Sequence, residues 1–194
     1  MGRVTADMSM SLDGFITAPR DTRDQPLGEG GEVLHRWIFK DLGGGSVRDV
    51  PAIADAFAAM GAMVMGRHSF EVAEDAWGSD PPFRVPVFVL THHPRDTQVR
   101  GETSFIFSAS GFEATLERAK EAAGGSDVAL HGATPVQQAL RAGLLDELQI
   151  HLVPVLLGGG RRLFENHVDG QVQLETIRVA DDPGVTHVRY RVVR

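Results

Sequence analysis

Residues 64–71 read VMGRHSFE, an apolar stretch that passes through a glycine into a helical pattern. The run 62–65 has no polar side chain, as expected of a short buried strand. Gly66 has no Cβ and permits a tight turn, after which Arg67, His68 and Ser69 open a helix. A buried strand that turns directly into a helix is typical of α/β proteins with parallel strands.

Strand patterns recur on both sides of this unit. Val4, Ala6, Met8, Met10 and Leu12 alternate with other residues and predict a first, half-buried strand. Short apolar or alternating runs predict further strands at 85–91, 104–107, 127–130, 148–157, 171–180 and 185–193.

Helix signals lie between these strands. Residues 32–42 predict a short helix, and glycines at 61, 124 and 143 are placed to end others. Three capping signals precede helical patterns. They are Asp49 before Pro51, Ser110 with Glu113, and Thr134 with Gln137.

The order of these elements predicts the fold class. Strand and helix alternate up to about residue 147, which favours parallel pairing. The later strands have no helix between them, and DDPG at 181–184 is a hairpin signal. We therefore expect a single domain over 1–194 that is α/β and three-layered. Its mixed, mainly parallel sheet would have about eight strands, with about four helices and a C-terminal antiparallel hairpin.

Composition excludes several classes of protein. The chain has 194 residues, with 19 basic and 26 acidic side chains, which disfavours a generic nucleic-acid binder. It has no cysteine, so disulfides, thiolate metal sites and a cysteine nucleophile are excluded. No apolar run approaches about 20 residues, and no signal-peptide pattern follows Met1, so we expect a cytoplasmic protein without membrane contact.

Three turns at strand ends carry groups that suit an anionic ligand. Residues 66–69 read GRHS, residues 90–95 read LTHHPR, and residues 131–134 read HGAT. Backbone N–H groups at helix starts, together with guanidinium, imidazole and hydroxyl groups, bind phosphates well. Each turn alone is equally consistent with a plain junction or a solvated turn. Together they favour a phosphorylated dinucleotide, and the positive charges favour NADPH over NADH. No G-x-G-x-x-G follows a strand, so a Rossmann site is not supported.

Several of these segments resemble a known superfamily. Residues 64–71 with 87–91 resemble dihydrofolate reductase, and SLDG at 11–14 is similar to its wider superfamily. The segment 146–164, which contains three successive glycines, looks more like the C-terminal reductase domain of the bifunctional riboflavin-biosynthesis deaminase-reductase and its stand-alone relatives. The resemblance covers nearly the whole chain. It implies an NADPH-dependent reductase, a small-molecule substrate and a homodimer.

The resemblance also implies a cofactor site. The first turn would hold the adenosine-side phosphate, the second would border the adenine and ribose, and the third would meet the diphosphate. The mobile loop formed by residues 13–31 would cover the nicotinamide. By number the residues of this site are Gly66, Arg67, His68, Ser69, Leu90, Thr91, His92, Gly132, Ala133, Thr134, Asp13 and Gly14.

The substrate side is less defined by the sequence. Trp37 would stack on a heteroaromatic ring, His151 would bond the substrate from its strand, and Arg161 would hold a substrate phosphate. Core packing, a strand histidine with a backbone partner, and a solvated arginine are the respective alternatives. No metal site is expected, because the eight histidines lack a spacing such as H-E-x-x-H.

The chain departs from the relatives in three respects. His131 stands where dihydrofolate reductases have the first of two glycines around a cis peptide, which leaves that peptide open. Glu32 and Asp41 are the only acids in the first helix, and neither aligns with the carboxylate that binds a pterin. The signature of a zinc deaminase is absent from this sequence.

These features predict hydride transfer from NADPH to a C=N, C=O or C=C bond. Reduction of the ribosylaminopyrimidine of riboflavin synthesis, 5-amino-6-(5-phosphoribosylamino)uracil, is the first expectation, and folate reduction is the second. A nucleotide-binding module without catalysis is a different class that would keep the same anion-binding turns. The sequence assigns no catalytic proton donor, and Glu32, Asp41 or an ordered water are its open choices.

Overall fold

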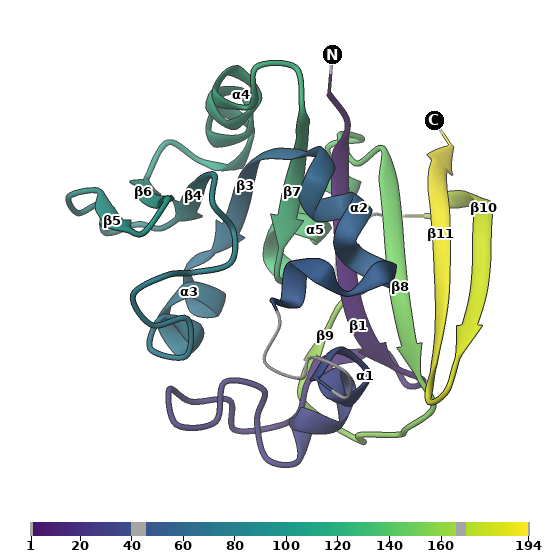
Figure 1. The fold of residues 1–194 in the computed structure, drawn as a ribbon. Helices are drawn as coiled ribbons and strands as arrows, with labels where there is room; N and C mark the ends of the chain where they lie inside the picture. The colour runs from purple at the N-terminus through teal and green to yellow at the C-terminus, as the bar shows by residue number, and fades with distance from the viewer. Residues whose placement is uncertain (1, 40–45, 166–169, 194) are drawn as a thin grey trace.

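The computed structural model describes residues 2–39, 46–165 and 170–193. Within these residues a nine-stranded sheet runs through the molecule in the order β10-β11-β8-β1-β7-β3-β4-β6-β5 (Figure 1). Its strands are β1 (Val4–Ser11), β3 (Met60–Gly66), β4 (Pro86–Leu90), β5 (Gln98–Arg100), β6 (Thr103–Ser108), β7 (Asp127–His131), β8 (Glu147–Val153), β10 (Gln173–Asp182) and β11 (Val185–Val193).

Pairing in the sheet confirms the predicted mixture. The six central strands from β8 to β6 pair in parallel. β5 is antiparallel to β6 at one edge, and β11 and β10 are antiparallel at the other. The strand count is higher than expected because the short strands β2 (Phe15–Thr17), β5 and β9 (Arg161–Arg162) were not predicted. Runs of two or three residues carry no periodicity, so tertiary pairing alone defines them.

Helices cover both faces of the sheet, giving three layers. α2 (Pro51–Ala59) and α3 (Arg67–Ala73) pack on one face, and Figure 1 shows α2 across the front of β1 and β8. α4 (Phe112–Ala123) and α5 (Ala133–Arg141) pack on the other face. η1 (Gly31–His35), α1 (Arg36–Phe39) and η2 (Val47–Asp49) are short, and residues 40–42 of the predicted first helix lie outside the described residues.

Two apolar cores follow from this layering. Leu116 and Ala119 of α4 and Val136 of α5 pack with the even-numbered side chains of β1, such as Ala6. On the opposite face, Phe70 of α3 packs with side chains from β3, β4 and β6. The odd-numbered side chains of β1 point to that second face, where they are polar rather than apolar.

The predicted capping signals are wrong in detail. Asp49 was expected to cap α2, but the N-cap of that helix is Val50, which has no capping side chain. Asp49 instead completes a capping box with Ser46 at η2, where its carboxylate accepts from the backbone N–H of Ser46. Glycines cap α4 and α5, with φ of 82° at Gly111 and 93° at Gly132, and no side chain bonds either cap. Glycine adopts such a positive φ without strain, so the chain can turn into a helix there without a capping side chain.

Expected boundaries also shift. β8 ends at Val153 rather than at 157. The residues that follow bond the turn after β1 instead, where the Leu12 N–H donates to the Val155 carbonyl and two further backbone N–H groups donate to the Asp13 carboxylate. The amide of Gln137, assigned to a capping box, instead donates to the carbonyl oxygens of Arg162 and Leu163 at 3.2 and 3.0 Å.

The predicted loop over residues 13–31 contributes one strand, β2, to a second, two-stranded sheet. β2 pairs with β9 in an antiparallel fashion, which joins the start of this loop to the segment after the three glycines. Gly160 has a φ of 120°, and a Cβ there would lie 1.9 Å from the carbonyl oxygen of Thr17. Only glycine fits this approach of the two backbones. The rest of the loop lies at the end of the sheet where the parallel strands finish (Figure 1).

In the part of the chain that the structure describes, no helix is long and apolar enough to cross a bilayer.

Phe70 offers a test of how firmly α3 is attached. Its ring is fully buried against Phe105 and Phe107, at centroid distances of 5.0 and 5.2 Å. Phe70→Ala should lower the free energy of unfolding by ~3–5 kcal/mol, measured by urea denaturation, because it removes a buried ring and leaves a cavity. Leu156→Ala is the control, since that side chain is 70% exposed and the loss should stay under about 0.5 kcal/mol. Equal losses in the two variants would contradict this packing.

Candidate active site

The three anion-competent turns lie side by side. β7, β3 and β4 are neighbours in the sheet and run parallel, so their carboxyl ends share one edge. Met65 pairs with His131, and Gly66 pairs with Leu90. The turns that follow these residues are therefore adjacent in space, although they are far apart in the sequence.

The first and third turns are in contact. A Cβ at Gly132 would lie 2.4 Å from the Ser69 hydroxyl oxygen, so this glycine lets the start of α5 approach the start of α3. The described residues contain no cis peptide, so the bond between His131 and Gly132 is trans.

A cleft of about 130 Å³ lies at this edge of the sheet. Side chains from β1, β2, η1, α3 and β9, together with the loop that follows β2, surround it. Four residues predicted for the cofactor or substrate meet there, namely His68, Ser69, Gly132 and Arg161. The structure thus brings two of the three predicted turns and the glycine-rich segment to one cavity.

Other predicted residues lie at the same edge but outside the lining of this cleft. Arg67 is exposed on α3, where its guanidinium bonds the Glu71 carboxylate at 2.9 and 3.0 Å. The Thr91 hydroxyl accepts from the backbone N–H of His93 at 3.0 Å, which shapes the turn after β4. Gly66, Leu90, His92, Ala133 and the exposed Thr134 complete this outer group.

Asp13 does not line the cleft but connects two segments beside it. Its carboxylate accepts from the Ser11 hydroxyl at 2.6 Å and from the backbone N–H groups of Leu157 and Gly158 at 3.1 and 2.7 Å. The Ser11 bond, followed by the two backbone bonds, lowers the pKa of Asp13 to about 2. Gly14, with a φ of 91°, turns the chain into β2. Asp13 therefore joins the end of β1 to the glycine turn.

Trp37 and His151 lie together behind the cleft. Their ring centroids are 4.4 Å apart, and the Trp37 indole N–H donates to the Ser9 hydroxyl at 3.2 Å. Ser9 lines the cleft, whereas Trp37 and His151 do not. Leu34 of η1 packs with Val153 and Val185 and fixes this segment over the ends of β8 and β11.

Four buried polar atoms without a hydrogen-bond partner belong to residues that line the cleft. They are Asp7 Oδ2, Thr17 Oγ1, His35 Nδ1 and Arg161 Nε, and only one other such atom, Gln138 Oε1, occurs in the described residues. An unsatisfied buried polar group costs roughly 1–3 kcal/mol. Their gathering around one cavity indicates a place for a polar ligand, which would supply the missing partners.

Burial sets the charge of the cleft. Desolvation lowers the pKa of His131 to about 4, and it does the same for His35, where His131 and His151 add to the effect. Both imidazoles are therefore neutral at pH 7. The Asp21 carboxylate lies 2.7 Å from His68 Nε2 and 3.9 Å from the Arg161 guanidinium. Within the described residues, no group of three or more histidines and acids is arranged to hold a metal ion.

Sequence reasoning missed Asp7, Thr17 and His35. Attention to strand ends does not reveal them, because Asp7 is in the middle of a central strand and His35 is in a short 3₁₀ helix. The available signal was a carboxylate in the middle of an otherwise well-patterned strand, since an acid is rarely placed there without a partner. The first-helix acids are not replacements: Glu32 is exposed, and Asp41 lies outside the described residues.

The order of strands and the cleft at their carboxyl ends define the class of fold, which is that of dihydrofolate reductase. A dihydrofolate reductase from Enterococcus faecalis, solved with NADP(H), superposes with a TM-score of 0.57 at 15% identity, covering 100% of this chain and 98% of that one. A protein assigned to riboflavin biosynthesis from Shewanella sp. PV-4 gives a TM-score of 0.71 at 21% identity, with 100% of both chains covered.

The family model described as the RibD C-terminal domain matches residues 3–187, so the chain belongs to this family. A curated relative, the Bacillus subtilis (strain 168) protein YyaP, is 27% identical over 174 residues, covering 84% of this chain and 80% of its own length. YyaP is described as uncharacterized. The predicted relationship to riboflavin-type reductase domains is confirmed at the level of family and fold.

The two neutral histidines predict acid lability. Their pKa of about 4 in the folded protein lies below the ordinary value of 6.5, so the unfolded chain binds protons first as the pH falls. The contribution of these two neutral histidines to folding stability is present above about pH 7 and is lost toward pH 4. Each of these two histidines should cost roughly 2 kcal/mol of folding stability between pH 7 and pH 5.

Urea denaturation across this pH range measures the effect. His35→Gln should reduce the pH dependence of the free energy of unfolding by the contribution of one histidine. The control His93→Gln, at an exposed position, should leave that dependence unchanged. If His35→Gln has the same pH dependence as the wild type, His35 is not buried in the neutral form.

Proposed function

We propose that this protein is an NADPH-dependent reductase that transfers hydride to a small heterocyclic substrate of the 5-amino-6-(5-phosphoribosylamino)uracil type. Membership of the RibD C-terminal domain family supports this reaction class. The observation that carries the proposal is the meeting of two strand-end turns with four unsatisfied polar atoms at one cleft. A plain structural junction has no need for such a gathering.

The cofactor would lie along the edge formed by β7, β3 and β4. In this proposal Arg67, His68 and Ser69 hold the adenosine-side phosphate, and Thr91 and His92 border the adenine and ribose. Further along the edge, Gly132, Ala133 and Thr134 present backbone N–H groups to the diphosphate, and Gly66 and Leu90 shape the floor between turns. When bound, NADPH supplies the hydride.

Arg95 adds positive charge to the same edge. Its guanidinium lies 4.1 Å from the ring centroid of Phe107 and 5.1 Å from that of Phe70, so the side chain is fixed over α3. A cation held on aromatic faces loses little freedom when it meets a phosphate. Arg95 therefore belongs with Arg67 in the proposed phosphate site.

The substrate would meet the cofactor within the cleft. Arg161, Thr17 and His35 offer unsatisfied donors and acceptors to a polar ring or a phosphate. Trp37 and His151 hold the neighbouring wall rather than stack on the substrate. Positioning a reactant against a cofactor removes much of the entropic barrier to reaction.

The loop after β2 would exclude water from this reaction. Asp21 bonds His68, and Arg23 forms an ion pair with the buried Glu74 beyond α3, so both residues hold the loop against the cleft. Asp13 and Gly14 start this loop and brace it on the glycine turn. The loop thus has the position expected of a lid.

Dihydrofolate is a second candidate substrate, favoured by one observation. Asp7 places a carboxylate in the cleft, and an unpartnered carboxylate oxygen suits the N–H groups of a pterin. A nucleotide-binding module without catalysis would bind NADPH equally well. Absorbance at 340 nm, followed with NADPH and either 5-amino-6-(5-phosphoribosylamino)uracil or dihydrofolate, separates the three. We expect NADPH oxidation with the first acceptor. Binding without turnover on either acceptor would favour the module.

We also propose that the protein is a homodimer that pairs through β10. This edge strand of ten residues is exposed along nearly its whole length, with Ile177 and Val179 at 42% and 60% exposure. An exposed, partly apolar edge is a template for pairing. Light scattering during gel filtration should give twice the chain mass, and Val179→Lys should shift it toward the monomer. A wild-type monomer would contradict the proposal.

Arg67 provides the test of cofactor choice. Arg67→Ala should weaken NADPH binding by roughly 10- to 100-fold, because a charge-assisted contact with a phosphate contributes ~1.5–3 kcal/mol. NADH binding should change little, since NADH lacks that phosphate. Fluorescence titration of both cofactors measures the two constants.

Arg191→Ala is the matched control. Arg191 is similarly exposed and is paired with Glu175, but it lies on the C-terminal hairpin. It should alter neither constant. If Arg67→Ala weakened the binding of NADPH and NADH equally, Arg67 would not contact the phosphate that distinguishes NADPH from NADH.

A further inference from the structure

Four ionisable side chains from neighbouring strands form a continuous hydrogen-bonded chain. Asp7 Oδ1 of β1 lies 2.5 Å from His151 Nε2 of β8, and His151 Nδ1 lies 2.5 Å from His187 Nδ1 of β11. His187 Nε2 is 3.1 Å from Asp182 Oδ2, at the end of β10. His151 and His187 are directly opposed in the antiparallel register, which fixes their rings together.

The two imidazoles are enclosed. His151 is 1% exposed and His187 is 8% exposed. Trp37 packs against both rings, at centroid distances of 4.4 and 4.9 Å. The two rings are in direct hydrogen-bond contact, so a proton that crosses between them passes from one Nδ1 atom to the other.

Proton counting shows that this chain is unusual. Three hydrogen bonds need three protons, but two neutral imidazoles carry only two, and ionised carboxylates carry none. One bond is therefore open unless a third proton is present. That proton can enter at His187 Nε2, cross between the two Nδ1 atoms, and leave at His151 Nε2.

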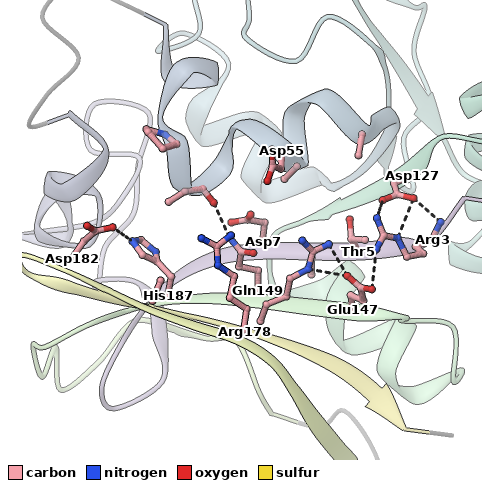
Figure 2. A pocket seen from close by; sticks show the side chains of 17 residues that line it. Arg3, Thr5, Asp7, Asp55, Asp127, Glu147, Gln149, Arg178, Asp182 and His187 are labelled. Carbon is pink, nitrogen blue, oxygen red and sulfur yellow. Dashed lines mark hydrogen bonds and ion pairs between the residues drawn. The ribbon is translucent and has the colours of Figure 1, made fainter.

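The hydrogen-bonded chain runs between two clefts, and Asp7 borders both of them. At one end, the second oxygen of Asp7 is buried and unpartnered, and Asp7 lines the candidate active-site cleft. At the other end, His187 and the 63%-exposed Asp182 line a second cleft of about 340 Å³ beneath α2, which Asp7 also borders (Figure 2). Figure 2 shows Asp182 and His187 at the far end of that cleft from Arg3 and Asp127. The chain thus leads from solvent to the active-site cleft.

Other cleft-lining groups are poorly suited to give up a proton. His35 and His131 are neutral at pH 7, because burial lowers the pKa of each to about 4. His68 is held by Asp21, and the Arg161 guanidinium does not deprotonate in proteins. Of the acids, Asp21 is occupied by His68 and faces Arg161. Asp7 is the remaining acid among the described residues that line this cleft.

We propose that Asp7 delivers a proton to the substrate and that His151, His187 and Asp182 restore this proton from the second cleft. The proposal rests on the proposed reductase function.

In the reacting state the third proton of the chain is on Asp7, which is then a neutral carboxyl group. A C=N bond of the substrate gains hydride at carbon from NADPH, which leaves as NADP⁺, and gains that proton at nitrogen from Asp7. The Asp7 carboxylate then takes the Nε2 proton of His151. His151 takes the Nδ1 proton of His187 in the same movement. A hydronium ion at Asp182 then gives its extra proton to His187 Nε2 and leaves as water.

Several charged groups surround the paired imidazoles and set their protonation. Burial lowers the pKa of His187 and the neighbouring His151 lowers it further, whereas Asp182 and Asp7 raise it. The other titratable or charged groups facing the chain are Asp55 of α2, Arg178 of β10, Arg189 of β11, His35 of η1 and His131 of β7. Arg189 is paired with Glu147 at 2.6 Å, so its charge is largely compensated.

The first experiment needs neither cofactor nor substrate. Nitrogen NMR of ¹⁵N-histidine-labelled protein follows all four ring nitrogens of the pair during a pH titration. We expect one proton to shift the nitrogens of both rings together, because the two sites share it. Asp182→Asn should lower the pH of this shared step, since it removes a carboxylate that favours the charged form. His93→Gln, at an exposed position, is the control. Independent titration of the two rings would overturn the proton chain.

The second experiment follows NADPH oxidation with 5-amino-6-(5-phosphoribosylamino)uracil. Asp7→Asn should lower kcat by ~100-fold or more, the usual size of a general-acid contribution, with the NADPH dissociation constant within about twofold. His187 is a positioning residue in this scheme, so His187→Gln should lower kcat at unchanged KM and shift the pH profile. Added imidazole should restore part of the rate.

These outcomes separate the two proposals. If the wild type oxidises NADPH and Asp7→Asn retains its kcat, Asp7 is not the proton donor and the inference fails. If the wild type turns over neither acceptor, the reductase function fails, and the shared NMR titration alone decides whether the chain conducts a proton. A merely structural role for His187 would change the melting temperature but leave the pH profile in place.

Discussion

Parallel pairing of the central strands is the constraint on which the site depends. Because β1, β7, β3 and β4 run in one direction, every turn that leaves them does so at one edge of the sheet. Residues separated by more than 60 positions in the sequence thereby meet at a single cleft. The short connections of an α/β fold then place helix starts at the same edge, where N–H groups and small residues face a ligand.

Much of this architecture was predictable because it follows from local pattern. Alternation in β1 and the apolar runs of β3 and β4 specify strands that bury one or both faces, and glycines mark the turns between them. The three-residue strand β2 and the two-residue strand β9 were not predictable, since their pairing depends on a backbone approach between distant segments. Helix caps were misassigned because glycine, rather than a side chain, turns the chain into α4 and α5.

The site was predicted unevenly for a related reason. Strand-end turns can be recognised from their composition, so His68, Ser69 and Gly132 were predicted, and they do line the cleft. Asp7 and His35 were missed, because their importance comes from what surrounds them and not from their place in a pattern. His151 was noticed as a strand histidine, but its partners on β1 and β11 are set by sheet order. Sequence reasoning thus identified the edge, and the structure adds the polar wall.

The close approach of Gly160 to Thr17 holds β2 and β9, two segments that line the cleft, in a fixed relative position. Thr17 and Arg161 both contribute unsatisfied atoms to the cavity, and the β2–β9 pairing fixes their spacing. A ligand that draws Arg161 inward therefore also pulls on the start of the covering loop. Thermodynamic reciprocity then requires the order of that loop to alter the affinity for the ligand by the same factor. If the cleft binds the proposed ligands, substitutions in this loop would therefore change ligand affinity without touching a bound atom.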